Sequence, residues 1–496
     1  MRPARGWPAL AGAGLAGAVA AFGQSPYDFP LLTLLGLSGA VWLFQARATP
    51  WQAALTGWAF GTGYFAHSLQ WIVSPFFVDA ARHGWMAPFA LVLMAAGLAL
   101  FWGLAFWLAR IIAPSRLWPL ALTWAAVEML RAYIFTGFPW AMPSQALVGQ
   151  ASGQLLAWIG PYGLNLLMFA AALLIGGAQM SNLRRGMVEA GCGALAALAL
   201  LLPYTGAASA MGQGVIRLIQ PNAPQHEKWD PEKIPIFFDR QLRLTATPLP
   251  EGSKSPDLVL WPETAIPYLL EHAAGPLAEI SQAAGDAQVG LGLQRRDPAG
   301  YYNAMITLGP NGAVNQIYDK HHLVPFGEYM PFTRFFSRIE IGGLAARVTS
   351  AYAAGPGPSL LNFGDLGTAL PLICYEAVFP HDVNAAPQRP DFLIQITNDA
   401  WFGKGAGPRQ HLAQARMRAI EQGLPLARAA NTGISAMIDP KGRVLAALPL
   451  NEAGFLDAAL PLPQPLTLYS RSGDLPLALL LLIGLASCAF LTRRRS

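Results

Sequence analysis

The sequence predicts two fold classes in one chain: a membrane bundle of α-helices, and an α/β domain inserted before the last helix of that bundle. Three observations lead to this prediction. The 496 residues are 53% hydrophobic and only 12% charged, with a mean hydropathy of +0.35, which is too little charge for a wholly soluble chain of this size. Long apolar segments fill the first two hundred residues and recur once near the C-terminus. The residues between them have the patterns of short strands and helices.

Seven apolar segments precede the polar block and an eighth follows it. They run over about 7–22, 29–45, 51–73, 85–109, 117–130, 160–178, 188–204 and 475–492. Each approaches the length that a helix needs to cross the hydrocarbon core of a bilayer, although the first and the fifth are short. We therefore expect a transmembrane helical region over 1–206 and a last span at 475–492.

Basic residues are distributed unevenly between the loops of this predicted bundle. With a cytoplasmic N-terminus, most of them fall on the inner side, and Arg82 is the clearest exception. The inner residues are Arg2, Arg5, Arg47, Arg110, Arg116, Arg184, Arg185 and, in the cytoplasmic tail at 493–496, Arg493, Arg494 and Arg495. An odd number of spans then places the polar block outside the cytoplasm. A cleaved signal peptide is the alternative interpretation of the first segment, and it would leave the block on the same side.

The polar block at 214–470 has the pattern of an α/β domain. Short β-rich runs bounded by Pro, Gly and Asp predict strands at 215–219, 258–260, 289–293, 304–308, 370–373, 392–396 and 435–438. Helical spacing predicts helices at 233–244, 270–284 and 410–423. The block holds 20 Lys and Arg against 23 Asp and Glu, so the net charge of +5 belongs to the membrane-flanking parts. We therefore exclude nucleic acid as a partner.

Cys374 follows a predicted buried strand, at a point where a turn exposes the side chain and directs backbone N–H groups toward it. A single cysteine is often only a small buried hydrophobe. However, Cys192 and Cys488 lie in predicted spans, so Cys374 is the only thiol of a domain expected outside the cytoplasm. It has no partner for an intramolecular disulfide. We interpret Cys374 as a nucleophile.

Two charged residues at predicted strand ends complete this group. Glu263 follows Pro262, which must end a strand ladder, and Lys320 follows another strand-like run. Taken singly, either is more typical of a surface charge. Beside a thiol whose free pKa is about 8.5, the cation favours the thiolate and the carboxylate takes the proton. The ammonium can then stabilise an oxyanion, an interaction worth about 3 kcal/mol per donor. Glu328 either orients Lys320 or is a structural carboxylate, and both interpretations stay open.

Two apolar features also have two interpretations each. The segment 330–344 is either an excursion at the membrane interface that admits a lipid chain or an insertion packed in the core. The pair Trp401-Phe402 is either a mobile gate or part of the core. The sequence does not decide between these alternatives.

Two polar pairs have plainer explanations. Glu128 and Arg131 are three residues apart on a predicted helix, which favours a structural ion pair over a contact with a phospholipid headgroup. His321 and His322 are adjacent, which gives poor geometry for one metal ion, and no cluster of other ligands completes a set. We expect neither a metal nor a cofactor.

The order Glu, Lys, Cys with these flanking residues resembles the nitrilase superfamily. Within it, the spans and motifs resemble the apolipoprotein N-acyltransferase family over nearly the whole chain. The motifs are TGFPW at 136–140, QPN at 220–222, KW at 228–229, the three catalytic stretches at 261–264, 318–322 and 372–376, NDAWFG at 398–403 and RMRAIE at 416–421. Pro221 and Leu424 depart from the pattern, where many relatives have Gly and Arg, and both concern loop details.

This resemblance implies a nitrilase-like αββα sandwich on the periplasmic face of the bacterial inner membrane, anchored by about eight spans. It also implies a two-step acyl transfer. Cys374 would take the sn-1 acyl chain of a phospholipid such as phosphatidylethanolamine as a thioester, with Glu263 as base and Lys320 stabilising the oxyanion. The N-terminal amine of a diacylglyceryl-modified apolipoprotein would then receive the chain, in the last step of lipoprotein maturation.

The resemblance further implies four residues that support the site or bind substrate, and these are Glu328, Tyr375, Glu376 and Trp229. We expect a monomer, because no heptad or association motif stands out. Two other functions remain open. A membrane-anchored nitrilase-type amidase would hydrolyse small amides with the same three residues. A membrane scaffold protein with an inactive triad would leave unexplained why a buried Glu and Lys stand together.

Overall fold

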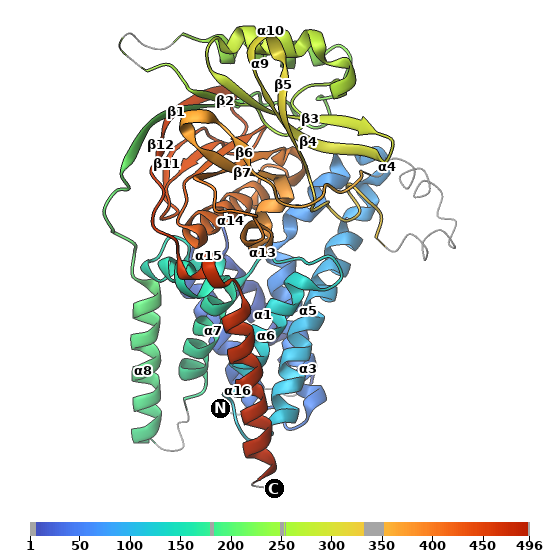
Figure 1. Cartoon of the computed structure of the whole chain (residues 1–496). Helices are drawn as coiled ribbons and strands as arrows, with labels where there is room; N and C mark the ends of the chain where they lie inside the picture. Colours follow the sequence, from blue (N-terminus) through green and yellow to red (C-terminus); the bar gives the residue numbers. More distant parts are fainter. Residues whose placement is uncertain (1–5, 179–182, 249–251, 253, 332–351, 495–496) are drawn as a thin grey trace. The chain divides into compact units, whose positions relative to one another are not determined.

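The computed structural model describes the chain except residues 1–5, 179–182, 249–251, 253, 332–351 and 495–496. The chain divides into two compact units (Figure 1). The helical unit comprises residues 1–207, 405–422 and 466–496, and the α/β unit comprises 208–404 and 423–465.

Each predicted apolar segment coincides with a helix of the helical unit. The long helices are α1 (Trp7–Ala20), α2 (Pro30–Gln45), α3 (Pro50–Ser68), α5 (Ala87–Ile112), α6 (Pro119–Tyr133), α7 (Leu156–Gly176), α8 (Leu183–Leu201) and α16 (Leu475–Arg493). Shorter elements are η1 (Ala21–Gly23), η2 (Gln70–Phe77), α4 (Ala80–His83), η3 (Gly84–Met86), η4 (Pro143–Leu147), η5 (Ala151–Leu155) and α15 (Leu468–Ser472), and α14 (Ala406–Gln422) also belongs to this unit. Among the described residues, three helical stretches are long and apolar enough to cross a membrane, over 80–112, 151–176 and 475–492.

Two helices end or bend at places that hydropathy does not reveal. The third predicted segment, 51–73, runs past the end of its helix, since α3 ends at Ser68 and the apolar chain continues as the 3-10 helix η2. In α7, Gly160 has a φ of 65° and precedes Pro161, so the helix is kinked there. Proline cannot donate its backbone hydrogen bond and clashes with the preceding turn, which explains the kink.

The pair Glu128 and Arg131 lies on α6 with both side chains fully buried. Arg131 Nη2 lies 2.8 Å from Glu128 Oε2. Trp102 Nε1 donates to Glu128 Oε1 at 2.7 Å, and Arg131 Nη1 donates to the carbonyl of Trp140 at 2.9 Å. These contacts within the protein satisfy both charges, so the predicted structural ion pair is confirmed.

The α/β unit contains two six-stranded sheets in the described part of the chain. Their orders are β12-β1-β2-β3-β4-β5 and β11-β10-β9-β8-β7-β6. The first sheet is formed by β1 (Met211–Gln220), β2 (Leu258–Leu260), β3 (Gln288–Asp297), β4 (Gly300–Leu308), β5 (Val314–Asp319) and β12 (Gly454–Pro461). The second is formed by β6 (Leu361–Asn362), β7 (Thr368–Ile373), β8 (Phe392–Thr397), β9 (Leu426–Ala430), β10 (Ala436–Ile438) and β11 (Val444–Ala447). The predicted strands are all present.

Two apolar cores hold these sheets in place. One lies between the sheets and joins residues such as Leu260 and Met305 of the first to Ile373 and Ile396 of the second. The other lies between the first sheet and the helices α9 (Ile234–Ala246) and α10 (Ala274–Ala284). The remaining short elements are η6 (Leu270–His272), η7 (Pro310–Gly312), η8 (Gly364–Leu366), η9 (Cys374–Val378), α13 (Pro380–Asn384) and η10 (Asp399–Phe402). The sandwich of two sheets agrees with the predicted nitrilase-like class.

Strand direction brings the carboxyl ends of several strands to matching edges. In the first sheet β2 runs parallel to β3, and β5 runs the same way because two antiparallel pairings separate it from β3. In the second sheet β7, β8 and β9 are parallel. Residues that follow β2 and β5 therefore share one edge, and those that follow β7 and β8 share another. The three predicted catalytic residues follow β2, β5 and β7.

Candidate active site

Cys374 stands at a sharp turn directly after β7. Its φ of 52° lies in the left-handed region, which is uncommon for a residue with a side chain. The following 3-10 helix η9 begins at Cys374 itself. Gln395 Nε2 donates to the Cys374 carbonyl at 3.2 Å and helps to fix the turn. Strain of this kind persists where the surrounding structure enforces it, often at functional sites.

Glu263 is held by hydrogen bonds from both sheets. Asn303 Nδ2, on β4, donates to Glu263 Oε1 at 2.7 Å. The backbone N–H of Asn398, which follows β8, donates to Glu263 Oε2 at 2.8 Å. The Glu263 side chain is only 8% exposed. Each carboxylate oxygen thus has a fixed donor, and the carboxylate is oriented before substrate arrives.

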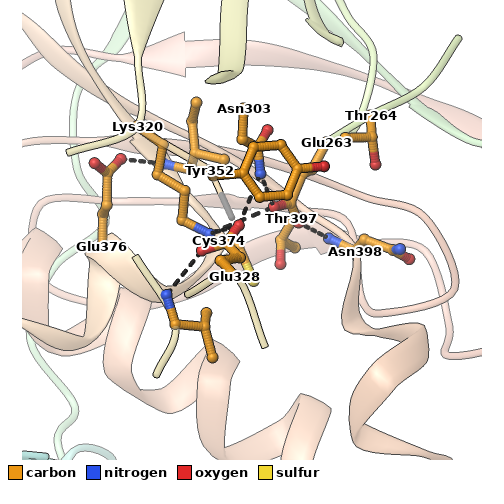
Figure 2. A network of polar contacts seen from close by, with 12 residues as sticks. Glu263, Thr264, Asn303, Lys320, Glu328, Tyr352, Cys374, Glu376, Thr397 and Asn398 are labelled. Carbon is orange, nitrogen blue, oxygen red and sulfur yellow. Dashed lines mark hydrogen bonds and ion pairs between the residues drawn. The ribbon is translucent and has the colours of Figure 1, made fainter. Parts of the chain in front are cut away.

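Lys320 lies between two carboxylates in the same network (Figure 2). Its Nζ donates to Glu328 Oε1 at 2.8 Å and lies 3.6 Å from Glu263 Oε1. Burial alone would lower the pKa of Lys320, but the charges of Glu328 and Glu263 outweigh it and raise the pKa well above the usual value. Lys320 is therefore an ammonium at any physiological pH.

The charges of Glu263 and Lys320 both act on the Cys374 sulfur. Burial raises the pKa of the Cys374 thiol well above its usual value, the nearby Glu263 charge raises it further, and Lys320 opposes both. This differs from the sequence-based expectation of a thiol that ionises near neutral pH, because desolvation outweighs the cation. The sulfur keeps its proton at rest, and a base must remove that proton as the sulfur attacks.

Glu328, one of the four supporting residues, belongs to the same network. Its Oε1 accepts from Lys320 and, at 3.1 Å, from Asn303 Nδ2, while its Oε2 accepts from the backbone of Val324 at 2.8 Å. The ring of Tyr352 is also part of this group (Figure 2). Burial, followed by the Glu328 and Glu263 charges, raises the pKa of Tyr352 to about 12, so the phenol keeps its proton.

Glu376 and Tyr375 lie behind the nucleophile turn rather than among the reacting groups. Glu376 is fully buried, and its Oε2 accepts from the backbone of Ile373 at 2.7 Å. Its Oε1 accepts from the backbone of His321 at 2.8 Å and from the hydroxyl of Tyr318 at 3.0 Å. One carboxylate thus connects the segment that carries the catalytic lysine with the segment that carries the cysteine. The Tyr375 side chain is buried too, 4% exposed.

Trp229 is connected to the site through its neighbour Lys228. The indole is 43% exposed, and Lys228 Nζ lies 5.2 Å from its ring centre. Lys228 Nζ donates to Thr264 Oγ1 at 3.0 Å and to the Glu263 carbonyl at 3.3 Å. Burial lowers the pKa of Lys228 to about 8, against the opposing effect of the Glu263 charge.

The structure adds residues that sequence reasoning missed. Asn303 and Tyr352 were not predicted, and Asn398 was noted only as part of a motif. A weak signal existed for Asn303, since it is a polar residue inside a strand-like run and is 3% exposed. Tyr352 had none, because it lies 24 residues beyond Glu328 in the chain.

Three further features of the sequence bear on the site. Most of the segment 330–344 lies outside the described residues. Trp401 is 42% exposed and so is not a core residue, whereas the partly buried Phe402 packs against the core between the sheets. His321 contacts Glu376 and His322 contacts Asp382 through their ring nitrogens. Within the described ranges, no group of three or more potential ligands could hold a metal ion.

Comparison with known proteins assigns both parts of the chain. The family model for the carbon-nitrogen hydrolase matches residues 238–464, and that for the apolipoprotein N-acyltransferase N-terminal domain matches residues 16–174. An apolipoprotein N-acyltransferase of Caulobacter vibrioides is 38% identical, over 97% of this chain and 95% of that protein. One of Rhodopseudomonas palustris is 36% identical, over 99% of this chain and 96% of that protein. The chain belongs to the apolipoprotein N-acyltransferase family.

Membership of the apolipoprotein N-acyltransferase family makes this chain an enzyme, since the carbon-nitrogen hydrolase domain is a family of enzymes. The crystal structure of an amidase from Nesterenkonia sp. is similar over 55% of this chain and 98% of that chain, at 22% identity and a TM-score of 0.39. The acyltransferase assignment rests on the relatives of the whole chain, not on that similarity.

Proposed function

We propose that this enzyme transfers a fatty acyl chain from a phospholipid, through a thioester on Cys374, to the N-terminal amine of a diacylglyceryl-modified apolipoprotein. The observation that carries the proposal is the network that holds Glu263 and Lys320 beside Cys374. The three residues are 6%, 1% and 5% exposed. A thioester formed there is shielded from bulk water, which favours transfer to an amine over hydrolysis.

In the first step the Cys374 sulfur bonds to the carbonyl carbon of the sn-1 ester while Glu263 receives the thiol proton. Glu263 can do so because its carboxylate is already oriented by Asn303 and Asn398. The oxyanion that develops is stabilised by the Lys320 ammonium. When the bond between the carbonyl carbon and the glycerol oxygen breaks, Glu263 returns the proton to that oxygen, and a lyso-phospholipid leaves.

In the second step the neutral amine of the acceptor attacks the thioester carbon. Glu263 takes a proton from the amine and passes it to the sulfur as the carbon–sulfur bond breaks. The products are an amide on the apolipoprotein and the free thiol of Cys374. The same ammonium of Lys320 stabilises both tetrahedral intermediates, since both place an oxyanion on the same carbon.

The proposal includes an arrangement in the membrane. About eight helices span the bacterial inner membrane, the α/β unit faces the periplasm, and the protein acts as a monomer without a cofactor. The uneven distribution of arginines supports this orientation. Labelling of single introduced cysteines with a membrane-impermeant reagent tests it: a residue in the α/β unit should react from outside in intact spheroplasts.

The acyl intermediate is the sharpest test of the function. The purified full-length protein is incubated with phosphatidylethanolamine, and its intact mass is measured. We expect one acyl group on Cys374, absent from Cys374→Ala, and released on addition of a diacylglyceryl peptide with formation of a triacylated product. Ammonia release from small amides without any acyl adduct would support the amidase hypothesis instead.

A further inference from the structure

Two arginines are buried at the end of the helical unit where α2 stops. Arg47 follows α2 by two residues and is 7% exposed, and Arg110 lies in the last turn of α5 and is 6% exposed. Both converge on one atom. The backbone N–H of Arg47 donates to the Phe44 carbonyl at 3.0 Å, and Arg110 Nη2 donates to the same oxygen at 2.6 Å.

Arg110 is surrounded by neutral groups. Its Nη1 donates to the Pro114 carbonyl, and its guanidinium lies over the ring of Phe44, 4.1 Å from the ring centre. Its Nε is buried and has no hydrogen-bond partner. Carbonyl oxygens and an aromatic face solvate a cation in part but do not neutralise it.

The guanidinium of Arg47 has two hydrogen-bond donors without an acceptor. Its Nε and Nη2 atoms are both buried, and neither has a hydrogen-bond partner among the described residues. These two nitrogens form one edge of the guanidinium, with parallel N–H bonds that match two oxygens of a phosphate or carboxylate.

The helical unit offers no carboxylate for either arginine. Neither forms an ion pair with any described residue, in contrast to Arg131 on α6. The helical unit contains six acidic residues, Asp28, Asp79, Glu128, Glu189, Glu421 and Asp474. A buried charge without a partner is costly, so two such residues bound to the same carbonyl at the end of α2 indicate that an anion from outside the chain completes the site.

The level of the site in the membrane indicates which anion this is. Trp51, in the first turn of α3, and Trp118, directly before α6, are 73% and 41% exposed. Exposed tryptophans at helix ends are typical of the membrane–water interface, where lipid phosphates lie. Clustered arginines between helices at that level suit an anionic headgroup.

We propose that Arg47 and Arg110 form a binding site for a phosphate group, with Nε and Nη2 of Arg47 as its bidentate donors. The ligand class is the phosphodiester of an anionic phospholipid, or phosphate itself, since the chemistry is shared. The two arginines belong to the helical unit, whereas Glu263, Lys320 and Cys374 belong to the α/β unit.

The experiment measures binding to the full-length protein in neutral detergent. Phosphatidylglycerol, diacylglycerol and inorganic phosphate are titrated separately, and the shift in Tm and the lipid retained in native mass spectra are recorded. Arg47→Gln removes the donor pair, Arg47→Lys keeps the charge without the bidentate edge, and Arg116→Gln removes an exposed arginine from the neighbouring loop as the matched control.

For wild type and Arg116→Gln we expect stabilisation by phosphatidylglycerol but not by diacylglycerol. Arg47→Gln should weaken the lipid affinity about tenfold or more, and Arg47→Lys by less. Without added ligand, Arg47→Gln should be at least as stable as wild type, because it removes an unpaired buried charge and no hydrogen bond of the guanidinium. An equal effect from inorganic phosphate identifies free phosphate as the ligand and still supports the site. Equal lipid affinity of wild type and Arg47→Gln would overturn the proposal, as would stabilisation of neither.

Discussion

The Nδ1 atom of His321 lies 2.6 Å from the Oε1 atom of Glu376. The same ring faces Asp382, whose Oδ2 is 3.6 Å from His321 Nε2, and the hydroxyl of Tyr318 lies 3.0 Å from Nδ1. His321 therefore balances the charge of a carboxylate that receives hydrogen bonds from the segments on both sides of the active site. We infer that this imidazolium positions the catalytic lysine relative to the cysteine.

Stability should depend on the protonation of His321 at alkaline pH. Burial lowers the pKa of His321, but the nearby carboxylates of Asp382 and Glu376 outweigh burial and raise the pKa to about 9. The folded value lies above the unfolded value of about 6.5, so the stabilisation is fully present below pH 6.5 and is lost as the pH rises through 9. We expect the Tm of the wild type to fall over this window by a few degrees.

The variant His321→Gln identifies the responsible group. It should have a lower Tm than wild type at pH 6.5 and a smaller further decrease up to pH 9.5, and the rate of acyl-adduct formation should fall about tenfold. His226→Gln is the matched control, because His226 is an exposed histidine whose ring pairs with Glu227 at the surface. If His226→Gln removed the alkaline transition and His321→Gln did not, the assignment would be wrong.

A second prediction concerns how Cys374 reacts. Because burial and the Glu263 charge raise the pKa of the thiol, alkylation by iodoacetamide should keep accelerating up to pH 9 rather than level off near neutral pH. Glu263→Gln should lower the rate of acyl-adduct formation about 10²–10⁴-fold, since it removes the base. The two readouts are the mass of the alkylated peptide and of the intact acyl-enzyme. A plateau in the alkylation rate below pH 8 would indicate a resting thiolate instead.

Lys320 should contribute to stability and to catalysis in separable ways. Lys320→Met leaves the Glu263 and Glu328 carboxylates close together without a cation, and breaking a buried ionic group of this kind costs about 3–5 kcal/mol. Adding Glu328→Gln should restore much of the Tm, because only one negative charge remains. The double variant should still form the acyl adduct about 10²-fold or more slowly, since the oxyanion donor is missing. Recovery of both properties would argue against the catalytic role.

The sequence predicts those residues of the site that directly follow a strand. Glu263, Lys320 and Cys374 each follow a short apolar run; strands of the same direction bring Glu263 and Lys320 to one edge of the first sheet, and Cys374 follows a strand of the second sheet. Asn303 was not predicted because it lies near the start of an antiparallel strand, and its neighbours in the sequence indicate only a strand. The hydrogen bond from the backbone N–H of Asn398 was not predicted, because a motif of side chains carries no information about main-chain donors.

The prediction of the helices from the sequence is limited in a similar way. Hydropathy predicts where apolar chain is long, so all eight segments were located, but it does not predict where the helix stops. The apolar run after Ser68 continues as a 3-10 helix, and α7 begins at Leu156, before the kink at Gly160 where the sixth predicted segment starts. The sequence pattern also did not predict how the polar block divides between the two units. The helix α14 connects β8 to β9 in the chain, yet it groups with the helical unit.

Gly292 on β3 offers a test of how finely Glu263 must be placed. A Cβ at this position would lie 2.6 Å from the Cα of Glu263 and 2.7 Å from the carbonyl oxygen of Pro262, so Gly292→Ala must displace the backbone that carries the base. Since a shift of about 1 Å can cost about 10²-fold in rate, we expect acyl-adduct formation to fall 10–100-fold. Gly275→Ala on α10 is the matched control, because a Cβ there meets nothing within 4 Å and alanine favours a helix. It should keep full activity at an equal or higher Tm. Full activity of Gly292→Ala would show that the site tolerates a displaced base, and the fixed orientation of Glu263 would then have no part in catalysis.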